Sequence, residues 1–163
     1  MANKFLSLLA MALCPLLMVG CICQQQQQQN KPPHRGYKKA PYTLKGVRYV
    51  PLSVEQALHY REDGIASFYE ANGRPGAIGE RLFPREFYAA HKTLPLPCKA
   101  RVTNLSNGKS CIVRVADRGP FIHNRIIDVS TSVARYLGFE RKGIERVRVE
   151  VISVGDGKWK RTR

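Results

Sequence analysis

The sequence predicts an all-β fold, a small six-stranded barrel with one short helix. From Tyr42 onward, short apolar stretches alternate with Gly, Pro and Asn, which is typical of strands joined by tight turns. The dipeptide Asn107-Gly108 separates two stretches of alternating residues and predicts a β-hairpin. A clear helical period follows Ser130. About six strands with abundant turns favour a closed barrel.

The hairpin around Asn107 and Gly108 is explicit enough to assign a register. A two-residue type I′ turn would place one apolar and one mixed face on the ribbon. The pairs on the apolar face are Asn104/Cys111, Val102/Val113, Ala100/Val115 and Cys98/Asp117, and those on the mixed face are Arg101/Arg114 and Thr103/Ile112. In this register Cys98 and Cys111 lie about 20 Å apart, whereas a disulfide needs Cα atoms within about 7 Å. We therefore expect these two cysteines to be unbridged.

The remaining elements follow from local signals. Four more strands are expected at residues 64–69, 87–91, 125–129 and 146–153, the last with Val147, Val149 and Val151 on one face. Ser130 is expected to cap the helix, whose apolar side is Val133, Ala134 and Leu137 and which ends at Gly138. Ser53 and Gln56 have capping-box spacing, so a second short helical turn is expected within residues 53–60.

The first twenty residues resemble an export signal. Lys4 precedes an apolar run over residues 5–19, shorter than the roughly 20 residues of a spanning helix. Small residues before Cys21 favour a lipoprotein signal peptide over residues 1–20, with a diacylglycerol group on Cys21. The alternatives are a secreted protein cut near Gly20 and an uncleaved anchor helix. Because Ile22 rather than Asp follows, we expect sorting to a Gram-negative outer membrane, facing the periplasm.

The rest of the chain divides by composition. Residues 21–44 are rich in Gln, Pro and Lys and predict a disordered tether. Residues 45–154 are expected to form the barrel, and residues 155–163 are expected to form a basic tail. The formal charge is +15, from 27 basic and 12 acidic residues. Nucleic acid is a common partner for such a charge, but an exported protein meets lipid head groups and peptidoglycan carboxylates instead. We expect attraction to an anionic envelope, no nucleic-acid partner and a monomer.

Asp117 is the candidate catalytic residue. It follows the second hairpin strand on the apolar face, before a turn at Arg118-Gly119-Pro120, where a partly desolvated carboxyl can serve as a general acid. Alternatively, Asp117 is a turn residue whose carboxylate accepts hydrogen bonds from backbone amides. Glu80 is either a site residue or a solvated loop acid, His91 is more often structural, and Asp128 is expected to bond backbone near the Ser130 cap. No metal or organic cofactor is implied, because His91 has no partner at ligand spacing.

Six segments in order resemble the motifs of one known family. They are GIASFY (64–69), GE (79–80), AAHKTLP (89–95), RVTNLSNGKS (101–110), VRVADRGPF (113–121) and RIIDVS (125–130). Together they resemble the rare lipoprotein A family over residues 47–152. The resemblance implies a double-psi β-barrel and, for characterised members, lytic transglycosylase activity on glycan strands stripped of stem peptides.

The resemblance also assigns roles. The family's DRGP aspartate corresponds to Asp117 as general acid and base, and its GE glutamate and AAH histidine correspond to Glu80 and His91 in the substrate groove. Asp117 would protonate the leaving oxygen of the N-acetylmuramic acid to N-acetylglucosamine bond. The muramyl 6-hydroxyl would then attack to leave a 1,6-anhydro end, so no water need be positioned as in two-carboxylate hydrolases.

Two departures from the family pattern bear on catalysis. The family often has Thr-Ala-Asn where this chain has residues 76–78, Gly-Ala-Ile, and an acidic residue where this chain has Phe83. The family's C-terminal SPOR domain has no counterpart, so septal targeting is not expected. The alternatives are a noncatalytic, expansin-like peptidoglycan-binding module and a basic structural lipoprotein that bridges membrane and wall through charge alone.

Overall fold

A computed structural model describes residues 37–163 of the chain, except for the side chain of Lys158. These residues lie in one compact unit, Pro33–Arg163. The predicted signal peptide, the lipidation of Cys21 and most of the predicted tether therefore lie outside the described residues. None of the helices in the described part is both long and apolar enough to cross a bilayer.

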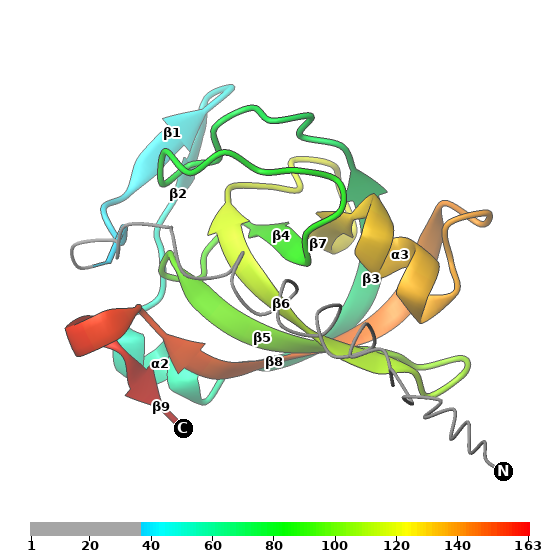
Figure 1. The fold of residues 1–163 in the computed structure, drawn as a ribbon. Coiled ribbons are helices and arrows are strands. Elements are labelled where there is room, and N and C mark those ends of the chain that lie inside the picture. The colour runs from blue at the N-terminus through cyan, green and yellow to red at the C-terminus, as the bar shows by residue number, and fades with distance from the viewer. Residues whose placement is uncertain (1–36) are drawn as a thin grey trace, which may run out of the picture. The chain divides into compact units, whose positions relative to one another are not determined.

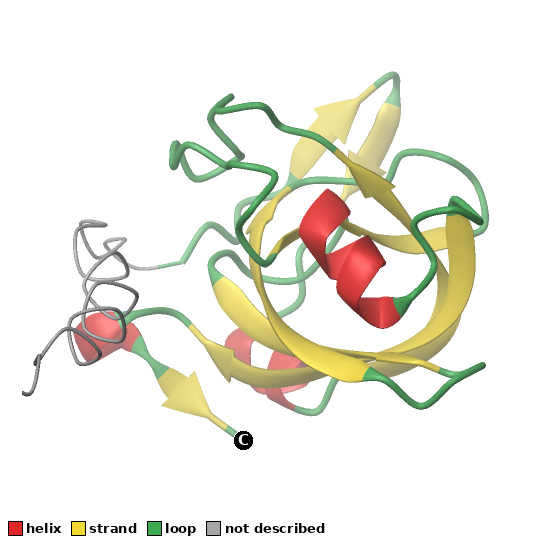
Figure 2. Ribbon diagram, turned by 45° about the vertical axis from the view of Figure 1, so that its right-hand side comes forward, coloured by secondary structure: helices red, strands yellow, loops and turns green. Residues whose placement is uncertain are grey.

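Six strands close into a barrel, as the sequence predicts (Figures 1 and 2). The barrel strands are β3 (Arg61–Tyr69), β4 (Tyr88–His91), β5 (Cys98–Asn104), β6 (Ser110–Asp117), β7 (Arg125–Ser130) and β8 (Ile144–Val154). Their order is β3-β7-β4-β6-β5-β8, and pairing of β3 with β8 completes the circle. The β3–β7 and β4–β6 pairs are parallel, whereas the other pairs are antiparallel. This closed arrangement is a double-psi β-barrel.

The barrel interior is filled by the alternate residues of each strand. Along β8 the side chains of Val147, Val149 and Val151 are at most 1% exposed, which confirms the predicted inward face. Val113 and Val115 of β6 are fully buried in the same core. The four predicted strands are all present, and β3 and β8 extend beyond the predicted ends because their antiparallel pairing runs from Arg61 to Ser67.

Both predicted helices are confirmed. Helix α3 (Thr131–Leu137) is capped by Ser130, whose hydroxyl accepts a hydrogen bond from the Val133 amide, and Gly138 ends it in the left-handed conformation. Helix α2 (Val54–Leu58) has the full capping box between Ser53 and Gln56. These caps satisfy backbone donors that a helix leaves free at its first turn.

The predicted hairpin register is wrong by two residues. Ala100 pairs with Val113 and Cys98 with Val115, so the loop is longer than a two-residue turn. A type I′ turn needs positive φ at both central residues. Here Gly108 has a φ of 74°, whereas Asn107 is not among the residues with positive φ. A shift of two keeps every side chain on its predicted face, because the side-chain period of a strand is two.

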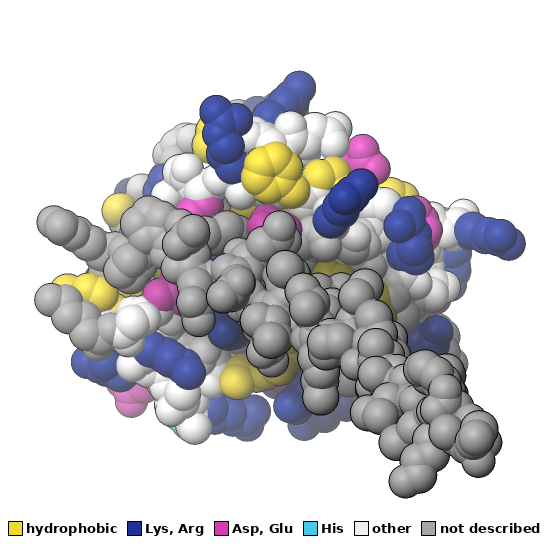
Figure 3. Space-filling model, viewed as in Figure 1, with side chains coloured by type: hydrophobic (Ala, Val, Ile, Leu, Met, Phe, Trp, Pro, Cys, Tyr) yellow, Lys and Arg dark blue, Asp and Glu magenta, His cyan; other side chains and the backbone are white. Residues whose placement is uncertain are grey.

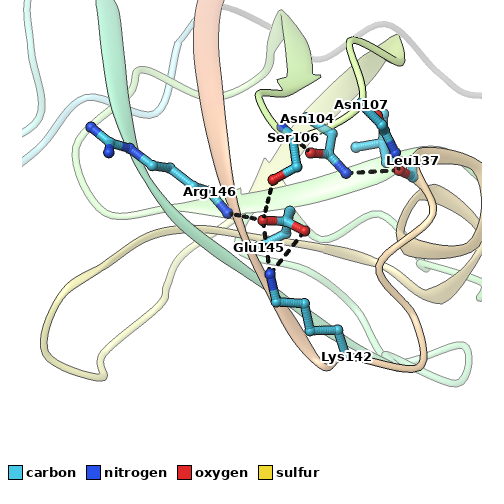
Figure 4. Close-up of polar contacts among 7 residues, drawn as sticks. All are labelled: Asn104, Ser106, Asn107, Leu137, Lys142, Glu145 and Arg146. Atoms are coloured by element: carbon cyan, nitrogen blue, oxygen red, sulfur yellow. Dashed lines mark hydrogen bonds and ion pairs between the residues drawn. The ribbon is translucent and has the colours of Figure 1, made fainter.

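The loop is long because it binds the end of α3 (Figure 4). The side-chain amides of Asn104 and Asn107 both donate to the backbone carbonyl of Leu137, at 3.0 and 2.9 Å. That carbonyl is one of the acceptors a helix leaves free at its C-terminus. On the same loop, the hydroxyl of Ser106 donates to the carboxylate of Glu145.

Cys98 and Cys111 are unbridged, as predicted. In the observed register the partner of Cys98 is Val115, four residues from Cys111, so the two cysteines lie about 13 Å apart along the ladder. Burial raises the pKa of the Cys98 thiol to about 12 and that of Cys111 to about 11. Both thiols therefore stay protonated at neutral pH and react slowly.

Two segments extend beyond the expected borders of the domain. A hairpin of β1 (Tyr42–Leu44) and β2 (Val47–Tyr49) lies outside the barrel wall and takes in residues expected to belong to the tether (Figure 1). After the barrel, the chain forms a 3-10 turn, η1 (Gly157–Trp159), and strand β9 (Arg161–Thr162), which pairs with β8. The expected basic tail is thus part of the folded unit.

Basic side chains are spread over the surface. In the view of Figure 3 the Lys and Arg side chains are scattered around the visible face instead of gathering in one patch. Such a distribution suits nonspecific attraction to an anionic surface, which raises encounter rate more than specificity.

Candidate active site

The candidate site is a row of side chains that crosses four barrel strands. Asp117 at the end of β6 and Asp128 on β7 are both cross-strand partners of Ala90 on β4. Ser67 on β3 is the partner of Asp128 on its other side. Directly opposed residues point to the same face of a sheet. The pairing of β4 with β6 has a register shift between Ala89 and Ala90, so the direction of the Asp117 side chain follows from its contacts and not from the pairing. Both carboxyls lie near the Tyr69 hydroxyl, whose pKa is raised by burial and also by their charges. Asp117 and Asp128 thus flank Ala90, with Cα atoms about 10 Å apart, two inter-strand spacings.

Asp117 is held in place by three donors. Its Oδ1 accepts hydrogen bonds from the backbone amides of Ala77 and Arg118, at 2.9 and 2.8 Å, and its Oδ2 accepts one from the Tyr69 hydroxyl at 3.2 Å. Burial, followed by the nearby charge of Asp117, raises the pKa of Tyr69, so this hydroxyl remains a donor. The side chain is half-buried. One of its bonds is to its own turn, as the turn-residue interpretation requires, but the other two come from segments far away in sequence.

Asp128 is not a backbone-bonding residue, contrary to expectation. Its Oδ1 accepts a hydrogen bond from the Ser67 hydroxyl, which in turn accepts one from Arg125 at 2.9 Å. Burial raises the pKa of the Asp128 carboxyl, and Ser67, Arg125 and Lys92 oppose this rise. A carboxyl with a raised pKa is a better proton donor near neutral pH. Sequence reasoning missed this residue because its place beside Asp117 depends on two pairings of β4.

Gly119 leaves the second oxygen of Asp128 uncovered. Its φ of 143° is disfavoured for other residues, and a Cβ atom there would lie 3.8 Å from Oδ2 of Asp128 and 3.6 Å from the Ala90 side chain. Because glycine has no side chain, no side chain of residue 119 contacts Ala90 or Asp128 at this point.

Glu80 lies in an ion-pair network. Its carboxylate accepts two hydrogen bonds from Arg114, at 3.0 and 2.8 Å, and its side chain is only 11% exposed. The same guanidinium binds both oxygens of Asp156, at 2.9 and 2.6 Å. The bidentate pair fixes the loop over residues 70–87, which also supplies the Ala77 amide to Asp117. In this arrangement Glu80 acts on the site through the loop.

His91 is buried and has no free nitrogen. Its Nδ1 accepts hydrogen bonds from the amides of Thr93 and Leu94, both at 3.1 Å, so the ring proton is on Nε2, which donates to the Tyr60 hydroxyl at 2.9 Å. Burial, with Arg118 and Lys92 adding to it, lowers the pKa of His91 to about 3. The ring is neutral and structural. The role of His91 in the substrate groove stays a prediction; its side chain is 4% exposed.

Arg118 turns away from Asp117. Its guanidinium donates to the carbonyls of His91 and Leu94, at 3.3 and 2.5 Å, and to that of Lys38 at 3.0 Å. Burial lowers the pKa of this guanidinium. Its positive charge is therefore balanced by carbonyl dipoles, and it links the start of the described chain to the end of β4 and the segment after it.

The altered loop before Glu80 contributes backbone to the site. A Cβ atom at Gly76 would lie 2.9 Å from the Ala116 carbonyl and 2.8 Å from the Leu82 side chain. A threonine, frequent at this position in the resembled family, would not fit without moving the loop. Phe83, which replaces an acidic residue, is 48% exposed.

Within residues 37–163, no group of three or more His, Cys, Asp or Glu side chains is arranged to hold a metal ion.

Comparison with known proteins identifies the family. A family model described as lytic transglycolase matches residues 61–149, which contain both aspartates. The chain belongs to the rare lipoprotein A family. The endolytic peptidoglycan transglycosylase RlpA of Pseudomonas aeruginosa strain UCBPP-PA14 is 50% identical over 123 residues, which are 74% of this chain and 36% of the relative. The enzyme of the same name from Neisseria meningitidis strain Z2491 is 49% identical over 116 residues, or 70% of this chain and 48% of the relative.

The chain of this rare lipoprotein A family member matches between about a third and half of the length of the two relatives named above. Two solved structures are similar in part. The Streptomyces papain inhibitor has a TM-score of 0.48 and 20% identity, covering 56% of this chain and 94% of its own. The Clavibacter michiganensis expansin has a TM-score of 0.49 and 18% identity, covering 60% of this chain and 53% of its own.

Proposed function

We propose that this protein is an endolytic peptidoglycan lytic transglycosylase that cleaves the N-acetylmuramic acid to N-acetylglucosamine bond of glycan strands without stem peptides. The observation that carries the proposal is the placement of Asp117 and Asp128 on either side of Ala90, both near the Tyr69 hydroxyl. The names of the relatives, endolytic peptidoglycan transglycosylases, give the reaction.

The resemblance assigns both proton transfers to Asp117, but the surroundings of the two carboxyls favour dividing them. Asp128, whose pKa is raised by burial, donates its proton to the leaving O4 of N-acetylglucosamine as the bond from O4 to C1 breaks. The fixed carboxylate of Asp117 stabilises the oxocarbenium-like centre. It then accepts the proton of the muramyl 6-hydroxyl as this oxygen bonds to C1, and solvent returns the proton to Asp128.

The test is a digestion of amidase-treated sacculi, followed by mass spectrometry of 1,6-anhydro ends. Asp117→Asn and Asp128→Asn should each lower the rate by about 10²–10⁴-fold. Asp63→Asn, which makes the same change in an exposed ion pair with Arg148, is the matched control and should keep the parent rate. Full activity in both Asn variants would contradict the proposed chemistry. Binding of glycan with no anhydro product would support the noncatalytic, expansin-like module.

The pH profile separates the two carboxyls. If Asp128 is the proton donor, the rate of the parent falls at high pH as Asp128 ionises, and Asp128→Asn removes this limb of the profile. An unchanged alkaline limb in Asp128→Asn would return the acid role to Asp117.

We propose in addition that Cys21 is lipidated and holds the protein at the outer membrane, facing the periplasm, as a monomer. This rests on the signal pattern of residues 1–20 and the Ile22 that follows Cys21. Metabolic labelling of cells with an alkyne palmitate analogue should label the parent and not Cys21→Ala. Fractionation of the parent with inner membranes would contradict the outer-membrane assignment.

A further inference from the structure

Three aromatic rings outside the barrel core form one cluster. Tyr42 and Tyr49 of the β1–β2 hairpin are stacked, with ring centroids 5.1 Å apart and planes at 18°. Phe121, in the loop after β6, packs edgewise against both, at 6.4 Å from Tyr42 and 5.4 Å from Tyr49. Because these distances are similar, Phe121 lies beside the stack and does not cover the outer face of Tyr49.

The cluster borders the two candidate carboxyls. Phe121 follows Asp117 by four residues, and both its ring and the Asp128 carboxyl lie next to Gly119. A Cβ atom at Gly119 would be 4.0 Å from Phe121 and 3.8 Å from Oδ2 of Asp128. The ring of Phe121 and the carboxyl of Asp128 are thus separated by little more than one glycine.

The hairpin that carries the tyrosines is fixed to the barrel at this point. The Tyr42 hydroxyl donates to the carbonyl of Lys92 at 2.8 Å. The guanidinium of Arg118, the residue after Asp117, lies 5.3 Å from the centre of the Tyr42 ring, a cation–π contact. Tyr42 is therefore used for attachment, and the ring surface left for a ligand belongs to Tyr49 and Phe121. Phe121 is 39% exposed.

We infer that Tyr49 and Phe121 form a subsite that binds a pyranose ring of the glycan strand next to the bond that is cleaved. The aromatic face carries partial negative charge and attracts the C–H groups on the apolar face of a sugar, while the sugar hydroxyls stay at the rim. This inference rests on the proposed function. The family model matches residues 61–149, so the hairpin that supplies Tyr49 lies outside the matched region.

The test measures glycan binding by the full chain in detergent, in an Asp117→Asn background that limits cleavage. The probe is amidase-treated glycan strands, and Kd is measured by co-sedimentation. Tyr49→Leu and Phe121→Leu should each weaken binding about three- to tenfold, since they keep apolar bulk but lose the ring face. Tyr49→Trp keeps a ring and should retain the affinity, which separates a lost subsite from a misfolded hairpin.

Two control variants test whether the effect is specific. Ile122→Ser removes an exposed apolar side chain beside Phe121, and Tyr136→Leu removes an exposed ring that packs on Phe87. Both should keep the parent affinity within about twofold. The same proteins are tested on vesicles of phosphatidylethanolamine and phosphatidylglycerol, because the hairpin also exposes Val47 beside basic residues.

The outcomes distinguish the subsite from the reaction. Weaker glycan binding by Tyr49→Leu and Phe121→Leu supports the subsite. This holds even if the parent protein yields no anhydro ends in the digestion experiment, because that result would contradict only the proposed reaction. Unchanged glycan affinity in both variants overturns the inference. It is also overturned if the two variants lose vesicle binding alone, which would make the hairpin a membrane contact, or if the parent does not bind glycan.

Discussion

The guanidinium of Arg114 binds both carboxylate oxygens of Asp156, at 2.9 and 2.6 Å. Asp156 belongs to the segment after β8, and Arg114 to the barrel strand that ends at Asp117. Since Arg114 also holds Glu80, the segment after the barrel supports the loop that donates the Ala77 amide to Asp117. Residues 155–163, expected to be a basic tail, thus help to position the site.

Replacing Asp156 by alanine should therefore lower both stability and activity. The change leaves Arg114 with one carboxylate, and we expect the free energy of unfolding to fall by about 1–3 kcal/mol, as for loss of a charged hydrogen bond. Urea denaturation gives the value. Glu140→Ala, which breaks an exposed pair with Arg135, is the control and should lower the free energy of unfolding by less than Asp156→Ala does, because solvent screens an exposed pair. Equal losses in the two variants would show that the Arg114 network is no more than a surface pair.

His91 should make stability depend on pH. Its pKa is about 3 when folded and near its usual value of about 6.5 when unfolded. Above pH 6.5 both states are neutral and the full stability is present. As pH falls from 6.5 toward 3, the unfolded state takes up a proton that the folded state does not, so stability falls by up to about 1.4 kcal/mol per pH unit.

Urea denaturation at several pH values checks the His91 prediction. His91→Gln should be less stable at neutral pH but should show a flatter decline between pH 6.5 and 3. His59→Gln replaces an exposed histidine and should keep the slope of the parent. If stability falls with pH equally steeply in His91→Gln and in the parent, His91 is not the group that causes the pH dependence.

Asn104 should be a strong determinant of stability. Its side chain is 1% exposed, donates to the Leu137 carbonyl and accepts from the Ser106 amide. Asn104→Ala leaves buried polar groups unpaired and should lower the free energy of unfolding by about 2–4 kcal/mol. Lys109→Ala, in the same loop and exposed, should change it by less than about 0.5 kcal/mol. Thermal melts that rank these variants the other way would refute the docking of the loop on α3.

Restoring the family's threonine at position 76 should impair this protein. In Gly76→Thr the Cβ atom meets the Ala116 carbonyl, which cannot move without disturbing β6, so the loop shifts and Ala77 loses its bond to Asp117. We expect the yield of anhydro ends to fall at least tenfold. A tenfold lower rate corresponds to about 1.4 kcal/mol, which is the contribution of one well-placed hydrogen bond. Ile78→Asn introduces the neighbouring family residue without this contact and should stay close to the parent. Higher activity in Gly76→Thr would contradict the proposed role of the loop.

Local sequence determined the elements, because their signals act over a few residues. The caps at Ser53, Ser130 and Gly138 are confirmed, as is the inward row along β8. Six ordered motifs were enough to identify the family and the double-psi barrel. The faces of the paired hairpin residues, 98–103 and 110–115, were predicted correctly despite the wrong register, since a shift of two preserves side-chain direction.

Only the tertiary structure decided which distant residues meet. The hairpin register depends on the carbonyl of Leu137, a hydrogen-bond acceptor at a helix end some thirty residues away. The local turn signal at Asn107-Gly108 gives no information about this acceptor. The partner of Glu80 is Arg114, and the place of Asp128 beside Asp117 follows from the two neighbours of β4. Period and capping are properties of the local chain, whereas ion pairs and neighbouring carboxyls depend on how the closed barrel brings its strands together.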